Sequence, residues 1–376
     1  MRKFSLVVLS TAGLLLTAAV AVAIMLAPPA AAQQVVELDF ANGRTIISDE
    51  WQREMHSDVM AVDWERSILY VRDAEEPEGI MAFSLETGEW LRTLLTPIGE
   101  GPHEFPNGAR AVDVAPHGGI YASGFIKVVE FDRADTPINS WRPVAPTTWS
   151  VCDFGGQPAV PTQGGVVRRR ADGNSEEIGP VRARGVRITA SRDVFDAVSW
   201  RVLWSRLACT DDQAYVVVHS ERGADSVFVY NRDGSAHALP LPTEGIRGMT
   251  ECRPMRAIHY RPGVNTCPVG LSNLYPSFDD RGNLVLLGFD NKVHGVIINP
   301  ETGCHALIQN TTRLYNIPAR VYADSALVFH MGTVEVEHDG KIVEAFRDAA
   351  HGVSMVPFRR ISGQPCPGML PSVNWG

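Results

Sequence analysis

The chain has 376 residues, of which 45% are hydrophobic and 20% charged, and its formal net charge is −9 at pH 7. An acidic protein of this size is a poor candidate for non-specific nucleic-acid binding, which depends on excess positive charge. The 33 glycines and 25 prolines indicate a folded, turn-rich and mostly β protein.

The N-terminus has the pattern of a secretory signal peptide. Arg2 and Lys3 precede a nearly uninterrupted apolar run, Phe4–Leu26, and small residues follow up to Ala32. We therefore expect residues 1–32 to be a signal peptide that is cleaved after Ala32. Because the apolar run is long enough to span a bilayer, an uncleaved N-terminal anchor is the alternative. Both alternatives place the folded part outside the cytoplasm, in the periplasm or secreted.

The pattern that recurs most clearly along the rest of the chain is a strand, a tight turn and a second strand. Asp-Gly, Thr-Gly or similar pairs stand at the turns, where such residues tolerate positive φ at low cost. These hairpins are Met81–Leu94, Val128–Trp141, Val166–Ile178, Val227–Leu241, Gly295–Ile308 and Thr333–Phe346. A second hairpin precedes most of them, so each repeat makes a four-stranded antiparallel sheet. Six such sheets predict an all-β fold, a six-bladed β-propeller.

The second repeat resembles the NHL-type repeat, which occurs in six-bladed propellers that also include TolB-like proteins. The residues that carry this resemblance are Ile98–Phe105, Ala111–Asp113, Gly119–Tyr121 and Val129–Asp132. The Asn-His-Leu triplet that names the repeat is absent, and the other repeats match only in their strand and turn pattern. The resemblance implies the propeller fold over most of the chain and says little about activity.

The repeats divide the chain into a leader, a propeller and a tail. We expect residues 33–59 to be a leader whose strand-like pieces, Val35–Phe40 and Thr45–Ile47, add to the last blade and cover its edge. Residues 60–346 are expected to form the propeller and residues 347–376 a C-terminal tail. The blades are expected to begin near Met60, Ala109, Val151, Leu207, Tyr275 and Ala319.

Two links between blades are unusually long, Gly179–Arg206 and Pro242–Leu274, and the topology places both on the same rim. Long connections in compact domains tend to be functional or disordered. The second link is cationic and aromatic, which suits a protein partner or a small anionic or sugar-like ligand. A solvated loop is the alternative. The candidate binding residues of the second link are Arg253, Arg256, His259, Tyr260 and Arg261.

Six cysteines in an exported chain are compatible with disulfides. Cys252 and Cys267 lie close together in the second long link, and a bond between them would close a modest loop. The sequence leaves open whether the other cysteines pair across blades or fix the tail. These are Cys152, Cys209, Cys304 and Cys366.

Two further groups of polar residues raise the question of chemistry. His103 and Glu104 are adjacent in a Gly/Pro loop near the expected channel mouth, where they could act as base and orienting residue in hydrolysis. The matching position of the NHL-type repeat is usually a loop that packs between blades, and this alternative is favoured. We therefore expect no catalytic residue here and count His103 and Glu104 as candidate binding residues. A set of aspartates recurs near strand turns, and calcium prefers such oxygen ligands, as in propeller hydrolases of the gluconolactonase type. Hydrogen bonding of each aspartate to its own turn explains the recurrence without a metal. These aspartates are Asp63, Asp113, Asp211, Asp279 and Asp324.

Other sequence signatures of catalysis are missing: no HExxH, Gly-x-Ser-x-Gly, Walker-type or GxGxxG pattern occurs. The favoured hypothesis is an exported binding or interaction module without a cofactor. The alternative is a metal-dependent hydrolase or lyase with calcium or a similar ion in the central channel. The expected partner is a protein or a small anionic or sugar-like ligand, not nucleic acid. A membrane is expected only through an uncleaved N-terminal anchor.

Overall fold

The computed structural model describes residues 33–370, apart from gaps within this range. The gaps are 49, 52, 145–149, 163–164, 180–181, 184–185, 188–201, 221–225, 243–274, 288–292, 310–315, 339–340 and 365. The expected signal peptide therefore lies outside the described residues. Within the described part, no helix has the length and apolar character needed to cross a membrane. The regular structure described is β-strand, together with one short 3-10 helix, η1 (Phe40–Asn42).

Four-stranded antiparallel sheets follow one another along the chain, with strands paired in sequence order. The first contains β3 (Met55–Asp63), β4 (Ile68–Asp73), β5 (Gly79–Ser84) and β6 (Trp90–Leu95). The next contains β7 (Ala111–Val114), β8 (Ile120–Ser123), β9 (Val128–Phe131) and β10 (Pro137–Trp141). It is followed by β11 (Cys152–Asp153), β12 (Pro158–Pro161), β13 (Val166–Arg169) and β14 (Ser175–Ile178).

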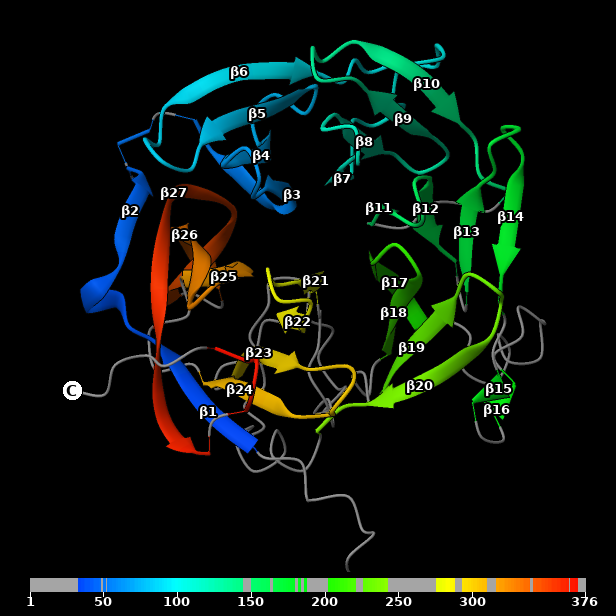
Figure 1. The fold of residues 1–376 in the computed structure, drawn as a ribbon. Coiled ribbons are helices and arrows are strands. Elements are labelled where there is room, and N and C mark those ends of the chain that lie inside the picture. Colours follow the sequence, from blue (N-terminus) through cyan, green and yellow to red (C-terminus); the bar gives the residue numbers. More distant parts are fainter. Residues whose placement is uncertain are drawn as a thin grey trace, which may run out of the picture.

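The same strand order continues in the second half of the chain. One sheet contains β17 (Val202–Cys209), β18 (Gln213–Ser220), β19 (Ser226–Asn231) and β20 (Ala236–Pro240). Another contains β21 (Tyr275–Phe278), β22 (Leu284–Leu287), β23 (Val293–Ile298) and β24 (His305–Gln309). A small hairpin of β15 (Arg182–Ala183) and β16 (Val186–Arg187) stands between sheets. The sheets are arranged around a central axis, with the first strand of each nearest the centre, as in a β-propeller (Figure 1).

The last sheet combines strands from both ends of the chain. β25 (Asn316–Tyr322), β26 (Ser325–His338) and β27 (Lys341–Gly363) pair in order, and β2 (Arg44–Ile47) pairs with β27. Arg44 lies opposite Met355. This part of the leader therefore adds a strand to the last sheet, as the sequence predicts. Residues 347–363 lie within β27 and therefore belong to this sheet and not to a separate tail. The apolar side chains of Val353 and Phe358 are buried there, which stabilises this pairing.

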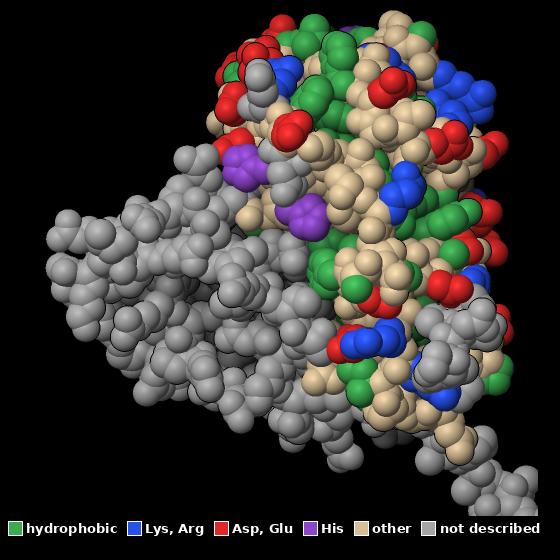
Figure 2. All heavy atoms as spheres, turned by 90° about the vertical axis from the view of Figure 1, so that its left-hand side faces the viewer, with side chains coloured by type: hydrophobic (Ala, Val, Ile, Leu, Met, Phe, Trp, Pro, Cys, Tyr) green, Lys and Arg blue, Asp and Glu red, His purple; other side chains and the backbone are tan. Residues whose placement is uncertain are grey.

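The first described strand, β1 (Gln33–Leu38), connects two sheets. It runs parallel to β24 and antiparallel to β27, and so lies between them. Seen from the side of β2 and β27, this edge of the molecule mixes acidic, basic and apolar side chains (Figure 2). The strand order therefore brings the start of the described chain and the end of β27 to one place in the ring.

Buried apolar clusters fill the spaces between successive sheets. Tyr70, Phe105 and Phe131 belong to the cluster between β3–β6 and β7–β10. A corresponding cluster joins β25–β27 to β3–β6, and Phe83 and Phe329 are both 0% exposed within it. Sheets that pack face to face in this way bury alternate side chains on both of their faces, which explains the dense apolar runs of the middle strands.

Two disulfides join segments that are distant in sequence. Cys152 at the start of β11 is bonded to Cys209 at the end of β17, with a Cα–Cα distance of 5.7 Å. Cys304 before β24 is bonded to Cys366 after β27, with a Cα–Cα distance of 5.9 Å. Both alternatives left open by the sequence therefore occur, one bond crossing between sheets and one fixing the C-terminal segment. The expected Cys252–Cys267 pair lies outside the described residues.

Candidate functional site

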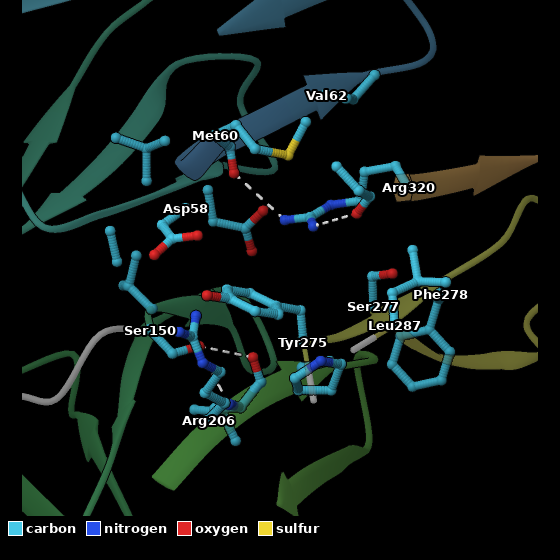
Figure 3. Close-up of a pocket in the computed structure, with 18 of the residues that line it drawn as sticks. Asp58, Met60, Val62, Ser150, Arg206, Tyr275, Ser277, Phe278, Leu287 and Arg320 are labelled. Carbon is cyan, nitrogen blue, oxygen red and sulfur yellow. Dashed lines mark hydrogen bonds between the residues drawn. The ribbon is translucent and has the colours of Figure 1, made fainter. Parts of the chain in front are cut away.

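A cavity of about 230 Å³ lies at the centre of the ring, among the innermost strands. β3, β7, β17, β21 and β25 all contribute to its lining (Figure 3). An innermost strand turns its unpaired edge toward the axis, so side chains from either face of the strand can reach the channel. The cavity combines an apolar portion, which includes Trp64 and Phe278, with a group of charged side chains.

Arg206 on β17 is the most enclosed of these charged groups, with only 8% of its surface exposed. Its guanidinium carbon lies 3.4 Å from the centroid of the Tyr275 ring, in a cation–π contact (Figure 3). Its Nε has no hydrogen-bond partner among the residues that the structure describes. Burial lowers the pKa of Arg206, and the nearby Tyr275 and Asp58 oppose this shift.

Arg320 on β25 lines the same cavity. Its Nη1 donates to the carbonyl oxygen of Ala319 at 2.8 Å, and its Nη2 donates to that of Met60 at 3.2 Å (Figure 3). Burial lowers the pKa of Arg320, the Asp113 carboxylate opposes this, and the positive charge of Arg206 adds to the lowering. The two positive charges therefore act on each other within one cavity.

Two carboxylates, those of Asp58 and Asp113, complete the charged part of the lining. Burial raises the pKa of the Asp113 carboxyl to about 6, although Arg320 lowers it. Burial also raises the pKa of the Tyr275 phenol; Arg206 opposes this shift, and Asp58, which accepts a hydrogen bond from the phenol, adds to it. Titratable groups shifted in this way within a cavity are typical of functional sites.

The recurrent aspartates do not all share one role. Asp63 Oδ1 accepts a hydrogen bond from the Arg66 amide at 2.9 Å, and Asp279 Oδ1 accepts one from the Asn283 amide at 2.8 Å. These two residues stabilise their own turns, as predicted. Asp113 differs, because it lies within β7 and its side chain lines the cavity.

His103 and Glu104 do not line the cavity. Glu104 Oε2 instead accepts a hydrogen bond from the amide of Gly101 at 2.8 Å, within its own loop. The side chain of Lys127, only 1% exposed, donates to the carbonyl oxygens of Gly101 and Glu104. In the described structure this Gly/Pro loop is thus held by a hydrogen bond of its own and by Lys127, and the binding role of His103 and Glu104 stays a prediction.

Replacing Lys127 by methionine should lower the free energy of unfolding by about 2 kcal/mol. The apolar side chain fills similar space but leaves two enclosed carbonyl oxygens without their charged donor, at a cost of about 1–3 kcal/mol each before relaxation. Urea unfolding followed by tryptophan fluorescence measures the change. An exposed arginine, Arg142, provides the control substitution Arg142→Met, which removes a positive charge that acts on Lys127 and therefore should not lower the stability. Equal stability of the Lys127 variant and the wild type would contradict this role.

The candidate residues of the second long link lie outside the described residues. They are Arg253, Arg256, His259, Tyr260 and Arg261. The chain runs from residue 274 directly into Tyr275, the first residue of β21 and part of the cavity lining. The link therefore joins the described structure beside the charged part of the cavity.

Comparisons with known proteins leave the family open. No family model and no curated protein matches the sequence. Among solved structures, virginiamycin B lyase from Staphylococcus aureus is 8% identical with a TM-score of 0.46, over 84% of this chain and 97% of that chain. A streptogramin B lyase is 11% identical with a TM-score of 0.45, over 87% of this chain and 98% of that chain.

A third similar structure is the extracellular domain of BT4673 from B. thetaiotaomicron. It is 11% identical with a TM-score of 0.46, over 81% of this chain and 40% of that chain. Similarities at these levels carry no argument about activity, and fold by itself does not determine function. The function has to be inferred from the site.

Proposed function

We propose that this protein is an exported six-bladed β-propeller that acts as a binding module and holds a small polar ligand in its central cavity. The pairing of β2 with β27 and the apolar cluster between β25–β27 and β3–β6 support a sixth blade that closes the ring. The signal-peptide pattern supports export, and so do the two disulfides, which persist mainly outside the cytoplasm.

The observation that carries the binding function is the presence, in the cavity wall, of enclosed polar atoms for which the described part of the chain supplies no partner. Arg206 Nε and Ser277 Oγ both lack a hydrogen-bond partner among the described residues, and each residue is only 8% exposed. Leaving a buried polar group unsatisfied costs about 1–3 kcal/mol. A ligand that supplies the missing partners recovers part of this cost when it binds.

A thermal-shift screen tests the proposal. The panel contains neutral sugars, sugar acids, small carboxylates, their amides and inorganic phosphate. We expect at least one compound at ten times its Kd to raise the Tm by about 2 °C or more. Ser277→Leu, which fills the cavity, should abolish the shift, whereas Ser140→Leu on the exposed outer strand β10 should keep it.

The outcomes of the screen separate the cavity from the rest of the surface. Absence of any shift, or a shift that survives Ser277→Leu, would overturn the cavity as the binding site. The same screen on a variant that lacks residues 253–266 tests the long link. Weaker shifts in that variant would support a contribution from Arg253, Arg256, His259, Tyr260 and Arg261.

A metal-dependent hydrolase or lyase is the second candidate, and the raised pKa of the Asp113 carboxyl favours it. Its metal fits the cavity poorly. Calcium takes six to eight oxygen ligands, whereas the cavity sets the Asp58 and Asp113 carboxylates among two guanidinium groups that repel a cation. Among the described residues, no group of three or more histidine, cysteine, aspartate or glutamate side chains is placed to hold a metal. Stoichiometric calcium or zinc in elemental analysis of the purified protein would favour the enzyme.

A further inference from the structure

The cavity holds two arginine side chains that have no ion pair within the described part of the chain. Among the described residues, no carboxylate lies within ion-pair distance of Arg206 or Arg320, whereas other arginines such as Arg66 and Arg168 do have such partners. Burial lowers the pKa of both cavity arginines, so each charge has lost part of its hydration. A desolvated cation without an anionic partner costs free energy that a bound anion would offset.

The cavity's own carboxylates compensate these cations only in part. Asp58 accepts a hydrogen bond from the Tyr275 phenol, and Asp113 has a pKa raised to about 6, so its neutral form is substantially populated near that pH. A planar guanidinium group presents parallel N–H donors that match a carboxylate or a phosphate. The Nε of Arg206, which has no partner among the described residues, and the guanidinium charge of Arg320 thus define an anion site within the cavity.

The charges and the apolar wall together discriminate between classes of anion. With Asp113 protonated, the two guanidinium groups and the Asp58 carboxylate leave one net positive charge, which a monoanion balances. Inorganic phosphate has no apolar body to pack against the rest of the wall. The rest of the wall includes Trp64 and Phe278, which provide an apolar surface for an organic body. A cavity of about 230 Å³ is smaller than those that enclose drug-sized ligands.

We propose that the cavity binds a small organic monocarboxylate, whose carboxylate is held by the guanidinium groups of Arg206 and Arg320 and whose apolar body packs against Trp64 and Phe278. This assignment rests on the proposed binding function and names the ligand class. Arg206 and Arg320 come from different sheets, β17 and β25, so the site forms only when the sheets are assembled around the axis.

Isothermal titration calorimetry at pH 6 with matched probes tests the assignment. The pairs are benzoate with benzamide and hexanoate with hexanamide, which differ mainly in the carboxylate, and inorganic phosphate is the third probe. We expect at least one acid to bind about tenfold more tightly than its amide, and phosphate to bind more weakly than that acid. Arg320→Gln should weaken binding of the acid by about tenfold or more and leave binding of the amide unchanged. Arg142→Met, at an exposed site, should change binding of neither the acid nor the amide.

Each other outcome overturns a definite part of the inference. An amide that binds as tightly as its acid would refute carboxylate recognition and leave the binding function standing. Tighter binding of phosphate would refute the monocarboxylate class. No binding by any of these probes refutes the monocarboxylate assignment, and the broader thermal-shift screen then decides the binding function. If Arg320→Gln does not fold, Arg206→Lys replaces it, and the comparison of acid with amide on the wild type decides independently of both.

Discussion

Replacing both Cys304 and Cys366 by serine should lower the free energy of unfolding by about 4 kcal/mol, the largest single effect that we expect. The two cysteines are separated by 62 residues, and a cross-link over such a distance strongly restricts the unfolded chain. Folded-state contacts add to the loss, because the bond holds Met369 and Leu370 in an apolar cluster, where they are 2% and 3% exposed. Guanidinium chloride unfolding measures the change.

The other disulfide provides a matched control for this prediction. Cys152 and Cys209 are separated by 57 residues, so their replacement by serine should give a nearly equal entropic loss. It should not, however, release the C-terminal segment. Limited proteolysis should therefore cut the Cys304/Cys366 variant near its C-terminus and leave that end of the Cys152/Cys209 variant intact. A loss below about 1 kcal/mol in the first variant would contradict the stabilising role.

The four-stranded sheets could be predicted from the sequence because their middle strands are buried on both faces and their turns contain glycine. Gly88, Gly118, Gly234 and Gly303 all have positive φ at hairpin turns, the conformation for which the Asp-Gly and Thr-Gly pairs were used as markers. Such local signals recur along the chain. They located the start of β21 at Tyr275 and the end of β6 at Leu95 without error.

The cavity could not be predicted in the same way, because its polar residues interrupt the apolar sequence pattern by which a strand is predicted. The repeat pattern places Asp58 in the leader, yet β3 already begins at Met55. It places Arg206 in a long link, yet β17 begins at Val202. The first part of β3 faces the channel and carries polar residues, so its apolar pattern starts late. These strands meet at one axis only in the assembled ring. The spacing of residues along the sequence does not show which side chains meet there.

The last sheet was misjudged for a related reason. The sequence predicts Thr333–Phe346 as the outer hairpin of the sixth repeat, but it is the far part of the longer β26–β27 ladder. Ser325 pairs with Pro357 at the base of this ladder, where the sheet joins its neighbours. A turn signal fixes where two strands reverse and not how far their pairing extends.

Replacing Asp113 by asparagine should remove a pH dependence of stability and make the protein more stable at pH 7. The folded-state pKa of this carboxyl is raised from 3.8 to about 6, so between these values the folded protein retains a proton that the unfolded chain has released. The contribution of Asp113 to stability is therefore fully favourable below about pH 4 and is lost as the pH rises through 6. A shift of this size corresponds to about 3 kcal/mol, which contact with channel water reduces to about 2 kcal/mol.

Urea unfolding of wild type and Asp113→Asn at pH 4, 5, 6 and 7 measures this contribution, and the difference between the two curves isolates it from all other titrating groups. Asparagine resembles the protonated carboxyl in shape and charge, so the variants should agree at pH 4 and diverge in favour of Asp113→Asn at pH 7. Asp172→Asn is the matched control: that carboxylate is exposed, and hydrogen bonds from Asn174 lower its pKa, so no gain at pH 7 is expected. Parallel curves, or a loss of stability at pH 7, would show that Arg320 holds Asp113 ionised and that the cavity is neutral. A neutral cavity would also remove the excess positive charge on which recognition of a monocarboxylate depends.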